Sequence, residues 1–312
     1  MVNYSGTALR TGWAEVPQPV RLEVERLLGD GVCAAVDQRG GFSHGVAVRV
    51  RTAGGGSAFV KAIEAGDGLA PVYRQEARIA SRLPVTTSAP RCRFVSEIAG
   101  WFVAGFDDVE GAFPRLDDPG ELQDTLDLVT RLATELTPSP LSDVPTVVDA
   151  YGPELVGWRT FVTAGPPADL DSWSVRHLTE LADLEATWMV AAAGDTLLHT
   201  DLRPDNMLRR ADGTVLAVDW AWACRGAAWL DLVALAPSIA AAGVDPEPII
   251  ATHPVTRDVD PAAVDAFVCA LAGYWAAACR KPGPPRSPFL REHQRTFARL
   301  TREWLACRLG AQ

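Results

Sequence analysis

The first third of the chain alternates apolar and polar residues, which is the period of half-buried β-strands. The segments VCAAVDQ (32–38), VAVRVR (46–51) and SAFVKAI (57–63) follow this pattern, and the glycine-containing turns RGGFSHG and TAGGG separate them. Before them, PQPVRLEVERLLG (17–29) has a helical spacing of apolar residues. This part of the chain is therefore predicted to be a helix followed by antiparallel strands.

A second helix is predicted over LAPVYRQEARIASRLP (69–84), with Pro71 in its first turn. Glu76 falls on the apolar stripe of this helix, so its carboxylate needs a buried partner. Lys61 is the candidate partner, because the chain contains only two lysines, Lys61 and Lys281, and otherwise uses arginine. The pair is either a purely structural ion pair or a device that holds the phosphates of a nucleotide.

The stretch LLHTDLRPDNMLRRADGTVLAVDW (197–220) places many polar groups between apolar runs, and its ADG predicts a tight turn. A two-residue loop at Asp212 and Gly213 places Asn206 directly opposite Asp219. An amide oxygen and a carboxylate brought together in this way suit an oxygen-ligated Mg²⁺. The hairpin therefore predicts a metal site at its open end.

Further polar residues surround this predicted metal site. Asp201 lies five residues before Asn206 across a proline-containing turn, close enough to accept the proton of a substrate hydroxyl. Arg203 is a candidate for neutralising charge on a transferred phosphoryl group. His199 is expected to brace the loop by hydrogen bonding rather than to react. A purely structural role does not explain so many polar groups around one hairpin.

The turn RGGFSHG (39–45) is open to two interpretations. GFSHG matches the pattern of a hydrolase nucleophile elbow with Ser43 as the nucleophile, but an elbow needs a helix directly after the serine, and a strand is predicted there. The alternative is a phosphate-binding loop in which Gly40, Gly41 and Gly45 remove side-chain bulk and Ser43 offers a hydroxyl. Glycine-rich hairpin turns without a ligand are common, so this second interpretation depends on the other residues.

Composition narrows the class of protein. At 312 residues with 48% hydrophobic content, the chain is long enough for a large core and two lobes. Its net charge of −10 argues against a nucleic-acid partner, because phosphate backbones are bound by dense Lys and Arg. The N-terminus shows no export-signal pattern, and the longest apolar run, from Ala266, predicts a buried helix too short to span a bilayer. With no C-x-x-C pair among its cysteines, the protein is expected to be cytoplasmic, with reduced thiols and no membrane partner.

Together these residues resemble the aminoglycoside phosphotransferase family. The pattern H-T-D-x-x-x-x-N at 199–206 resembles the catalytic loop of that family, and VDW at 218–220 resembles its metal-binding aspartate. Lys61 and Glu76 resemble the Lys and Glu pair of kinases, and Asp231 in WLDL resembles the segment after the metal site.

Two departures from related patterns accompany the resemblance. Thr200 replaces a glycine that the family often has between the catalytic His and Asp. The glycine-rich turn, G-G-x-x-x-G, differs from the G-x-G-x-x-G of protein kinases, and no D-F-G or A-P-E segment is evident. Both features favour a small-molecule kinase over a protein kinase.

The resemblance implies an α+β, bilobal protein-kinase-like fold. The N-terminal lobe, with an antiparallel sheet and one main helix, is expected over residues 1–106, and a mostly helical C-terminal lobe over 107–312. GWFVAGFDDVEGAF, from Gly100, resembles the edge strand and interlobe hinge, where backbone groups around Phe106, Asp107 and Val109 would hold the base of the nucleotide.

The implied activity is transfer of the γ-phosphoryl group from ATP, or GTP, with Mg²⁺, to a hydroxyl of a small molecule. The acceptor stays open between an aminoglycoside or another antibiotic and a metabolic amino alcohol, sugar or amino acid. The acidic runs 115–124 and 166–173 would attract amines if they line the acceptor site, although such runs are more often solvated loops. A nucleotide-binding pseudokinase that regulates a partner is the alternative, and the complete set of polar residues speaks against it. The oligomeric state is left open.

Overall fold

Five antiparallel strands form one sheet in the N-terminal part of the chain, in the order β1-β2-β3-β5-β4. The computed structural model describes residues 8–310. Its sheet consists of β1 Val32–Asp37, β2 Val46–Thr52, β3 Ser57–Glu64, β4 Cys92–Ile98 and β5 Trp101–Phe106. The three strands predicted over 32–63 are confirmed. The expectation of an edge strand at β5 is wrong, because β5 pairs with β3 on one side and with β4 on the other.

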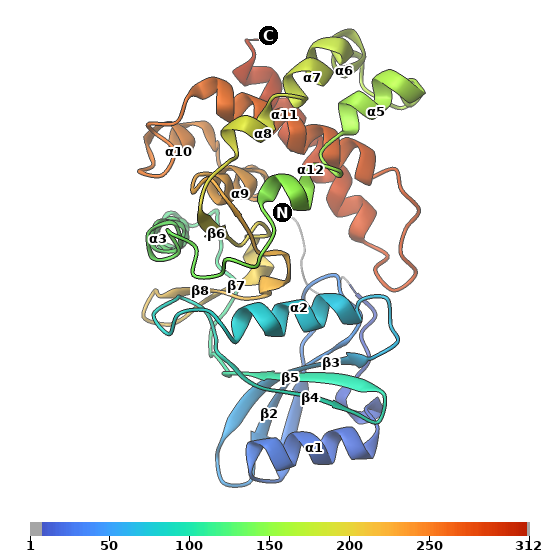
Figure 1. The fold of residues 1–312 in the computed structure, drawn as a ribbon, viewed down its shortest axis with the longest axis vertical. Helices are drawn as coiled ribbons and strands as arrows, with labels where there is room; N and C mark the ends of the chain where they lie inside the picture. Colours follow the sequence, from blue (N-terminus) through green and yellow to red (C-terminus); the bar gives the residue numbers. More distant parts are fainter. Residues whose placement is uncertain (1–7, 311–312) are drawn as a thin grey trace.

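A helix covers each face of this sheet (Figure 1). The short 3₁₀ helix η1 (Trp13–Glu15) leads into α1 (Gln18–Leu28), whose Val20 and Val24 share a buried cluster with the alternate valines of β2. On the opposite face, α2 (Ala70–Ala80) buries Tyr73 and Ala77 against β3 and β5. Both predicted helices are confirmed, although α2 ends before the predicted boundary.

The C-terminal part of the chain is mainly helical and holds the largest buried cluster. The longer helices are α3 Pro119–Glu135, α9 Leu230–Ala241, α11 Pro261–Ala278 and α12 Leu290–Arg308. The shorter helices are α4 Val147–Tyr151, α5 Gly157–Ala164, α6 Ser172–Arg176, α7 Leu178–Glu185, α8 Trp188–Ala191 and α10 Glu247–Thr252. This distribution of a sheet followed by helices confirms the predicted fold class.

Helix α11 is the core element of the helical part. It packs against α5, α7, α8, α9 and α12, and it crosses α5 so closely that a β-carbon on Gly157 would lie 1.9 Å from the carbonyl oxygen of Gly273. Among residues 8–310, α11 is the one helix that is long and apolar enough to cross a membrane. Its packing among other helices agrees with the buried helix predicted from Ala266.

Two short strand pairs carry the polar stretch 197–220. β6 (Thr196–Leu198) pairs with β9 (Cys224–Gly226), and β7 (Met207–Arg209) pairs with β8 (Val215–Ala217); the 3₁₀ turns η2 (Pro204–Asn206) and η3 (Trp220–Trp222) flank the second pair. Met207 faces Ala217, so the next pair outward joins Asn206 to Val218, whose N–H donates to the carbonyl of Asn206 over 2.9 Å.

The predicted register, with Asn206 opposite Asp219, is therefore wrong by one residue. The N–H of Arg210 donates to the carbonyl of Thr214, so three residues rather than two form the loop. Gly213 takes a left-handed conformation with φ +85°, as the last residue of a three-residue hairpin loop commonly does.

The two parts of the chain contact each other at several places, including the ion pairs of Arg78 and Arg82 with Asp143. α2 packs against η3. The segment between α11 and α12 extends toward the sheet and is the long loop at the right of Figure 1. There, Ser287 donates to the carbonyl of Phe42, and the N–H of Leu9 donates to the carbonyl of Arg286 over 2.9 Å.

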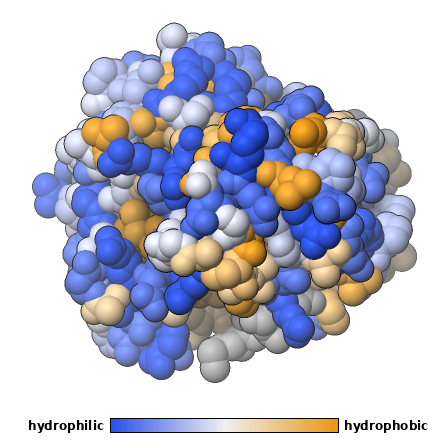
Figure 2. Space-filling view, turned by 90° about the horizontal axis from the view of Figure 1, so that it is seen from below, coloured by the Kyte–Doolittle hydropathy of each residue, from blue (hydrophilic) through white to orange (hydrophobic). Residues whose placement is uncertain are grey.

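The end of the molecule seen from the side of α1 is mainly hydrophilic with small scattered apolar groups (Figure 2), which is ordinary for a surface in water.

Candidate active site

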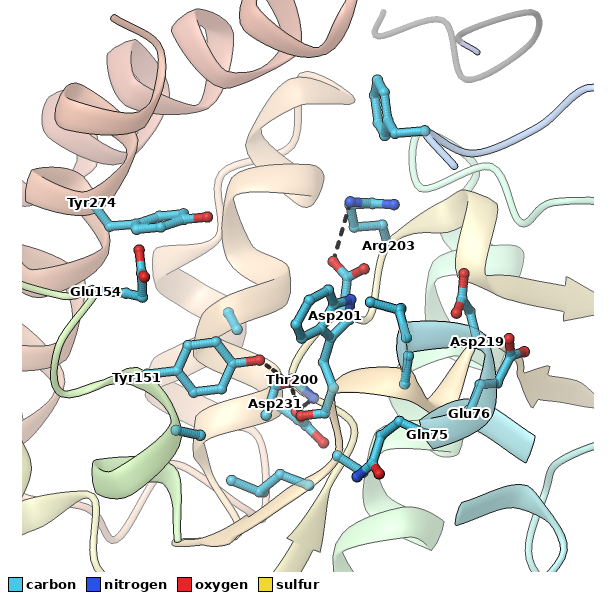
Figure 3. Close-up of a pocket in the computed structure, with 18 of the residues that line it drawn as sticks. Gln75, Glu76, Tyr151, Glu154, Thr200, Asp201, Arg203, Asp219, Asp231 and Tyr274 are labelled. Atoms are coloured by element: carbon cyan, nitrogen blue, oxygen red, sulfur yellow. Dashed lines mark hydrogen bonds and ion pairs between the residues drawn. The ribbon is translucent and has the colours of Figure 1, made fainter. Parts of the chain in front are cut away.

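Two cavities meet between the sheet and the helical part of the chain. The larger, about 740 Å³, is lined by the glycine-rich turn, α2, the stretch 198–223 and helices of the C-terminal part. The smaller, about 170 Å³, is lined by β2, β3, the segment 106–113 and the β7–β8 hairpin. Lys61, Glu76 and Asp219 line both cavities. These side chains therefore stand where the cavities join; Glu76 and Asp219 are seen near each other in Figure 3.

Lys61 and Glu76 form a buried ion pair across the sheet and α2. The Nζ of Lys61 lies 2.7 Å from both carboxylate oxygens of Glu76 and 3.5 Å from Oδ1 of Asp219. Burial alone would lower the pKa of Lys61, but the carboxylates of Asp219 and Glu76 raise it above its ordinary value. The ammonium therefore stays charged and is held at the junction of the two cavities, where it can meet an anion.

Asp201 is held by two neighbours from its own loop. The amide nitrogen of Asn206 donates to the backbone carbonyl and to Oδ2 of Asp201, over 2.8 and 2.9 Å. The guanidinium of Arg203 lies 3.2 Å from Oδ1 and also pairs with the buried Asp205. Burial raises the pKa of Asp201 to about 6, although Arg203 acts to lower it. At neutral pH this carboxylate is mostly ionised and can accept a proton.

His199 braces the loop, as predicted from the sequence. It is fully buried and lines neither cavity. Its Nε2 lies 2.8 Å from the carbonyl of Val218, and its Nδ1 accepts from the N–H of Asp201. Burial lowers the pKa of His199, which favours the neutral ring that these two contacts require.

Asp231, in the first turn of α9, fixes the backbone just before Asp201. Its carboxylate accepts from the N–H groups of His199 and Thr200 over 2.9 and 2.7 Å. Thr200 has φ +65°, a left-handed conformation that favours glycine. The hydroxyl of Thr200 contacts the hydroxyl of Tyr151 over 2.7 Å (Figure 3). The threonine at this unusual position therefore connects the loop to the wall of the larger cavity.

The glycine-rich turn closes one side of the junction. Gly40 and Gly41 line the smaller cavity and Ser43 the larger one. Gly45 lines neither cavity; it packs against Tyr73, where a β-carbon would lie 2.4 Å from the hydroxyl. Strand β2, not a helix, follows Ser43, so the nucleophile-elbow interpretation is wrong. Arg10, which the sequence did not single out, ties this turn together by donating to the carbonyls of Gly40 and Gly45.

The segment after β5 reaches the smaller cavity. Phe106, Asp107 and Val109, for which the sequence predicts an interlobe hinge, all line it. Asn206 and Asp219 line the same cavity from the other side. The smaller cavity therefore extends from this segment to Lys61 and Asp219.

The wall of the larger cavity contains residues that the sequence did not indicate. Tyr151 ends the short helix α4, Glu154 lies three residues after it, and Tyr274 lies on α11. They come from segments far apart in the chain, so no local pattern connects them. Trp222, at the end of η3, also lines the larger cavity and is about half exposed, whereas Trp220 and Trp229 are buried.

The acidic runs 115–124 and 166–173 do not line the larger cavity. Asp118 and Asp171 instead cap the N-termini of α3 and α6, and Asp169 pairs with Arg280. Their carboxylates are used in local structure, which is the common role of such runs.

Asn206 and Asp219 are the candidate metal ligands. The two hydrogen bonds donated by the Asn206 amide nitrogen fix the amide and leave its oxygen as an acceptor. Within residues 8–310, no group of three or more His, Cys, Asp or Glu side chains could hold a metal ion alone. This small oxygen donor set fits Mg²⁺, which keeps several waters and takes further ligands from substrate phosphates.

Comparison with known proteins agrees with this geometry. The model of the phosphotransferase enzyme family, APH, matches residues 39–252, which is more than half of the chain. The chain belongs to this family. It is a phosphotransferase with an alcohol group as acceptor, and the predicted family and enzyme class are confirmed.

Several solved structures have the same fold. A thermostable mutant of aminoglycoside phosphotransferase APH(4)-Ia has a TM-score of 0.61 at 12% identity, covering 95% of this chain and 99% of that one. Choline kinase LicA from Streptococcus pneumoniae has a TM-score of 0.62 at 14% identity, covering 93% and 98%. Amicoumacin kinase hAmiN has a TM-score of 0.57 at 13% identity, covering 94% and 95%. No curated protein matches the sequence. These low identities show the fold alone.

Proposed function

We propose that this protein transfers the γ-phosphoryl group of ATP or GTP to a hydroxyl of a small molecule. The observation that carries the proposal is that the Lys61–Glu76 pair and Asp219 stand at the junction of two cavities, with Asp201 in the lining of the larger one. The smaller cavity then holds the nucleotide and the larger one the acceptor. In this division, the nucleotide-binding lobe ends near residue 106, and the lobe from 107 onward carries the reactive loop and the acceptor site.

The residues of the chain position the reactants and balance their charge. Asp201 accepts the proton of the acceptor hydroxyl, whose oxygen forms a bond to the γ-phosphorus while the bond from that phosphorus to the β-phosphate oxygen breaks. Lys61, oriented by Glu76, holds the phosphates, and Arg203 offsets charge on the transferred group. When bound by Asn206 and Asp219, Mg²⁺ supplies further charge neutralisation.

Proteins of the same fold bind related ligands. One solved structure is a ternary complex with AMP-PNP and hygromycin B, and another contains AMP-PNP, Ca²⁺ and Ami. These complexes support a nucleotide as donor and a small molecule as acceptor for this chain. An antibiotic and a metabolic alcohol are both compatible with this general activity.

The proposal is tested by measuring Mg²⁺-dependent ADP and GDP formation with pools of aminoglycosides, peptide antibiotics, amino alcohols, sugars and homoserine. The Asp201→Asn variant serves as the blank. Nucleotide turnover above this blank with one pool is the expected result. Tight nucleotide binding without turnover, with every pool and with water, would instead favour a regulatory pseudokinase.

A further inference from the structure

We infer that the acceptor is a drug-sized, mainly apolar alcohol that carries one amine, rather than a polyamine such as an aminoglycoside. This inference rests on the proposed function, because it concerns the larger cavity as the acceptor site. At about 740 Å³, that cavity falls within the range of roughly 300–1,000 Å³ that is usual for small-molecule sites. Its size therefore suits an acceptor larger than choline-sized metabolites.

The walls of the cavity are mainly apolar. Helices and loops of the C-terminal part contribute Val147, Ala150, Leu155, Leu230, Ala234, Phe267 and Leu271, and aromatic side chains add Tyr151, Trp222, Tyr274 and Trp275. Such a surface gains free energy by covering apolar groups. An amine buried against it without a partner loses its hydration and costs free energy. Each amine of the acceptor therefore needs an anionic or aromatic partner.

Five carboxylates line the cavity, at Glu76, Glu154, Asp201, Asp219 and Asp231. Two of them already hold other groups of the protein in place. Glu76 holds Lys61 through both oxygens. Both oxygens of Asp231 accept from backbone N–H groups of the reactive loop. Both side chains are buried and their charges are already shared with these partners, so neither is offered to an acceptor amine as an exposed anion.

Two further carboxylates belong to the reaction. Asp219 contacts Lys61 and faces the junction with the nucleotide cavity. Asp201 is held by Asn206 and Arg203 and must meet the acceptor hydroxyl. An amine paired with Asp201 would block the group that accepts the proton.

Glu154 is the remaining carboxylate of the lining. Its only ion pair within residues 8–310 is with Lys281 at 3.8 Å, and both side chains are more than half exposed. Such exposed pairs contribute little stability, so an ammonium group can displace Lys281. Glu154 lies close to Tyr274 and on the same side of the cavity as Tyr151 (Figure 3), and aromatic faces attract cations. The site thus recognises one amine on that side, away from Asp201.

The test uses three single-amine apolar alcohols, propranolol, mefloquine and sphingosine, each beside its neutral N-acetyl derivative, with kanamycin and neomycin as polyamines. Binding is measured by calorimetry in the presence of Mg²⁺ and AMP-PNP, and transfer is measured with ATP. We expect at least one single-amine alcohol to bind and to be phosphorylated. Acetylation should weaken its binding by about five- to tenfold, as expected for one cation–π and carboxylate contact.

Two variants test whether Glu154 itself contacts the amine of the acceptor. Glu154→Gln should remove the difference between the amine and its N-acetyl derivative, whereas Glu180→Gln, an exposed glutamate outside the cavity, should keep that difference. The inference is overturned if no single-amine alcohol binds, if acetylation has no effect, or if a polyamine is phosphorylated with a higher kcat/KM than all three. ATP hydrolysis by water, compared between the wild type and Asp201→Asn, tests the proposed function separately because it needs no acceptor.

Discussion

Replacing Asp231 by alanine removes the group that fixes the reactive loop. The carboxylate accepts two buried N–H groups, from His199 and Thr200. A buried donor left without a partner costs about 1–3 kcal/mol, so two donors cost about 2–6 kcal/mol. Burial also raises the pKa of Asp231, because a buried carboxylate charge costs free energy. Removing this charge in Asp231→Ala therefore offsets part of the stability lost with the two hydrogen bonds. We therefore expect Asp231→Ala to lower the free energy of unfolding by about 2–4 kcal/mol.

Urea unfolding followed by circular dichroism measures this loss, with nucleotide turnover measured in parallel. Asp231→Asn keeps one acceptor oxygen and should lose about half as much stability. Asp183→Asn, on the exposed side of α7, is the matched surface control and should change neither stability nor turnover. If Asp231→Ala has the same urea midpoint as the wild type, with an unchanged dependence of the unfolding free energy on urea, the claim that Asp231 stabilises the loop is refuted.

Three further predictions concern the ion pair, the helix crossing and the metal. Lys61→Ala should raise the KM for nucleotide or lower kcat by at least about tenfold in steady-state kinetics, because the phosphates lose their buried ammonium and Glu76 is left unpaired. Gly273→Ala places a β-carbon 2.5 Å from Oε1 of Glu185 and should lower stability by about 1–3 kcal/mol in thermal unfolding. Gly283→Ala, where nothing lies within 4 Å, should leave the melting temperature unchanged. Chelation by EDTA should abolish phosphoryl transfer, and added Mg²⁺ should restore it; full activity in EDTA would contradict the assignment of metal ligands.

Local patterns in the sequence predicted three of the five strands of the N-terminal sheet, its two helices and the pairing of Lys61 with Glu76, but not strand β4. These features follow from periodicity, because a strand and a helix each place a given side chain on a definite face. The register at Asn206 was wrong by one residue, since a three-residue loop and a two-residue loop share the same turn residues. The hydrogen bond from the N–H of Arg210 to the carbonyl of Thr214 distinguishes them.

The wall of the acceptor cavity could not be predicted from the sequence. Tyr151 on α4 and Tyr274 on α11 line the same cavity only because the C-terminal helices pack together. Their positions show no shared spacing, and aromatic residues of this kind more often fill a core. The role of Thr200 was hidden for a related reason, because its left-handed backbone depends on the carboxylate of Asp231, 31 residues further along the chain.

The assignment of Asp201 as the proton acceptor is tested most directly by separating nucleotide binding from turnover in Asp201→Asn. Calorimetry with Mg²⁺ and AMP-PNP gives the binding constant, and release of ADP or GDP gives the rate. We expect the Kd to stay close to that of the wild type while kcat falls by about 10²- to 10⁴-fold, the usual contribution of general acid–base catalysis. Turnover equal to that of the wild type would contradict the proposed mechanism.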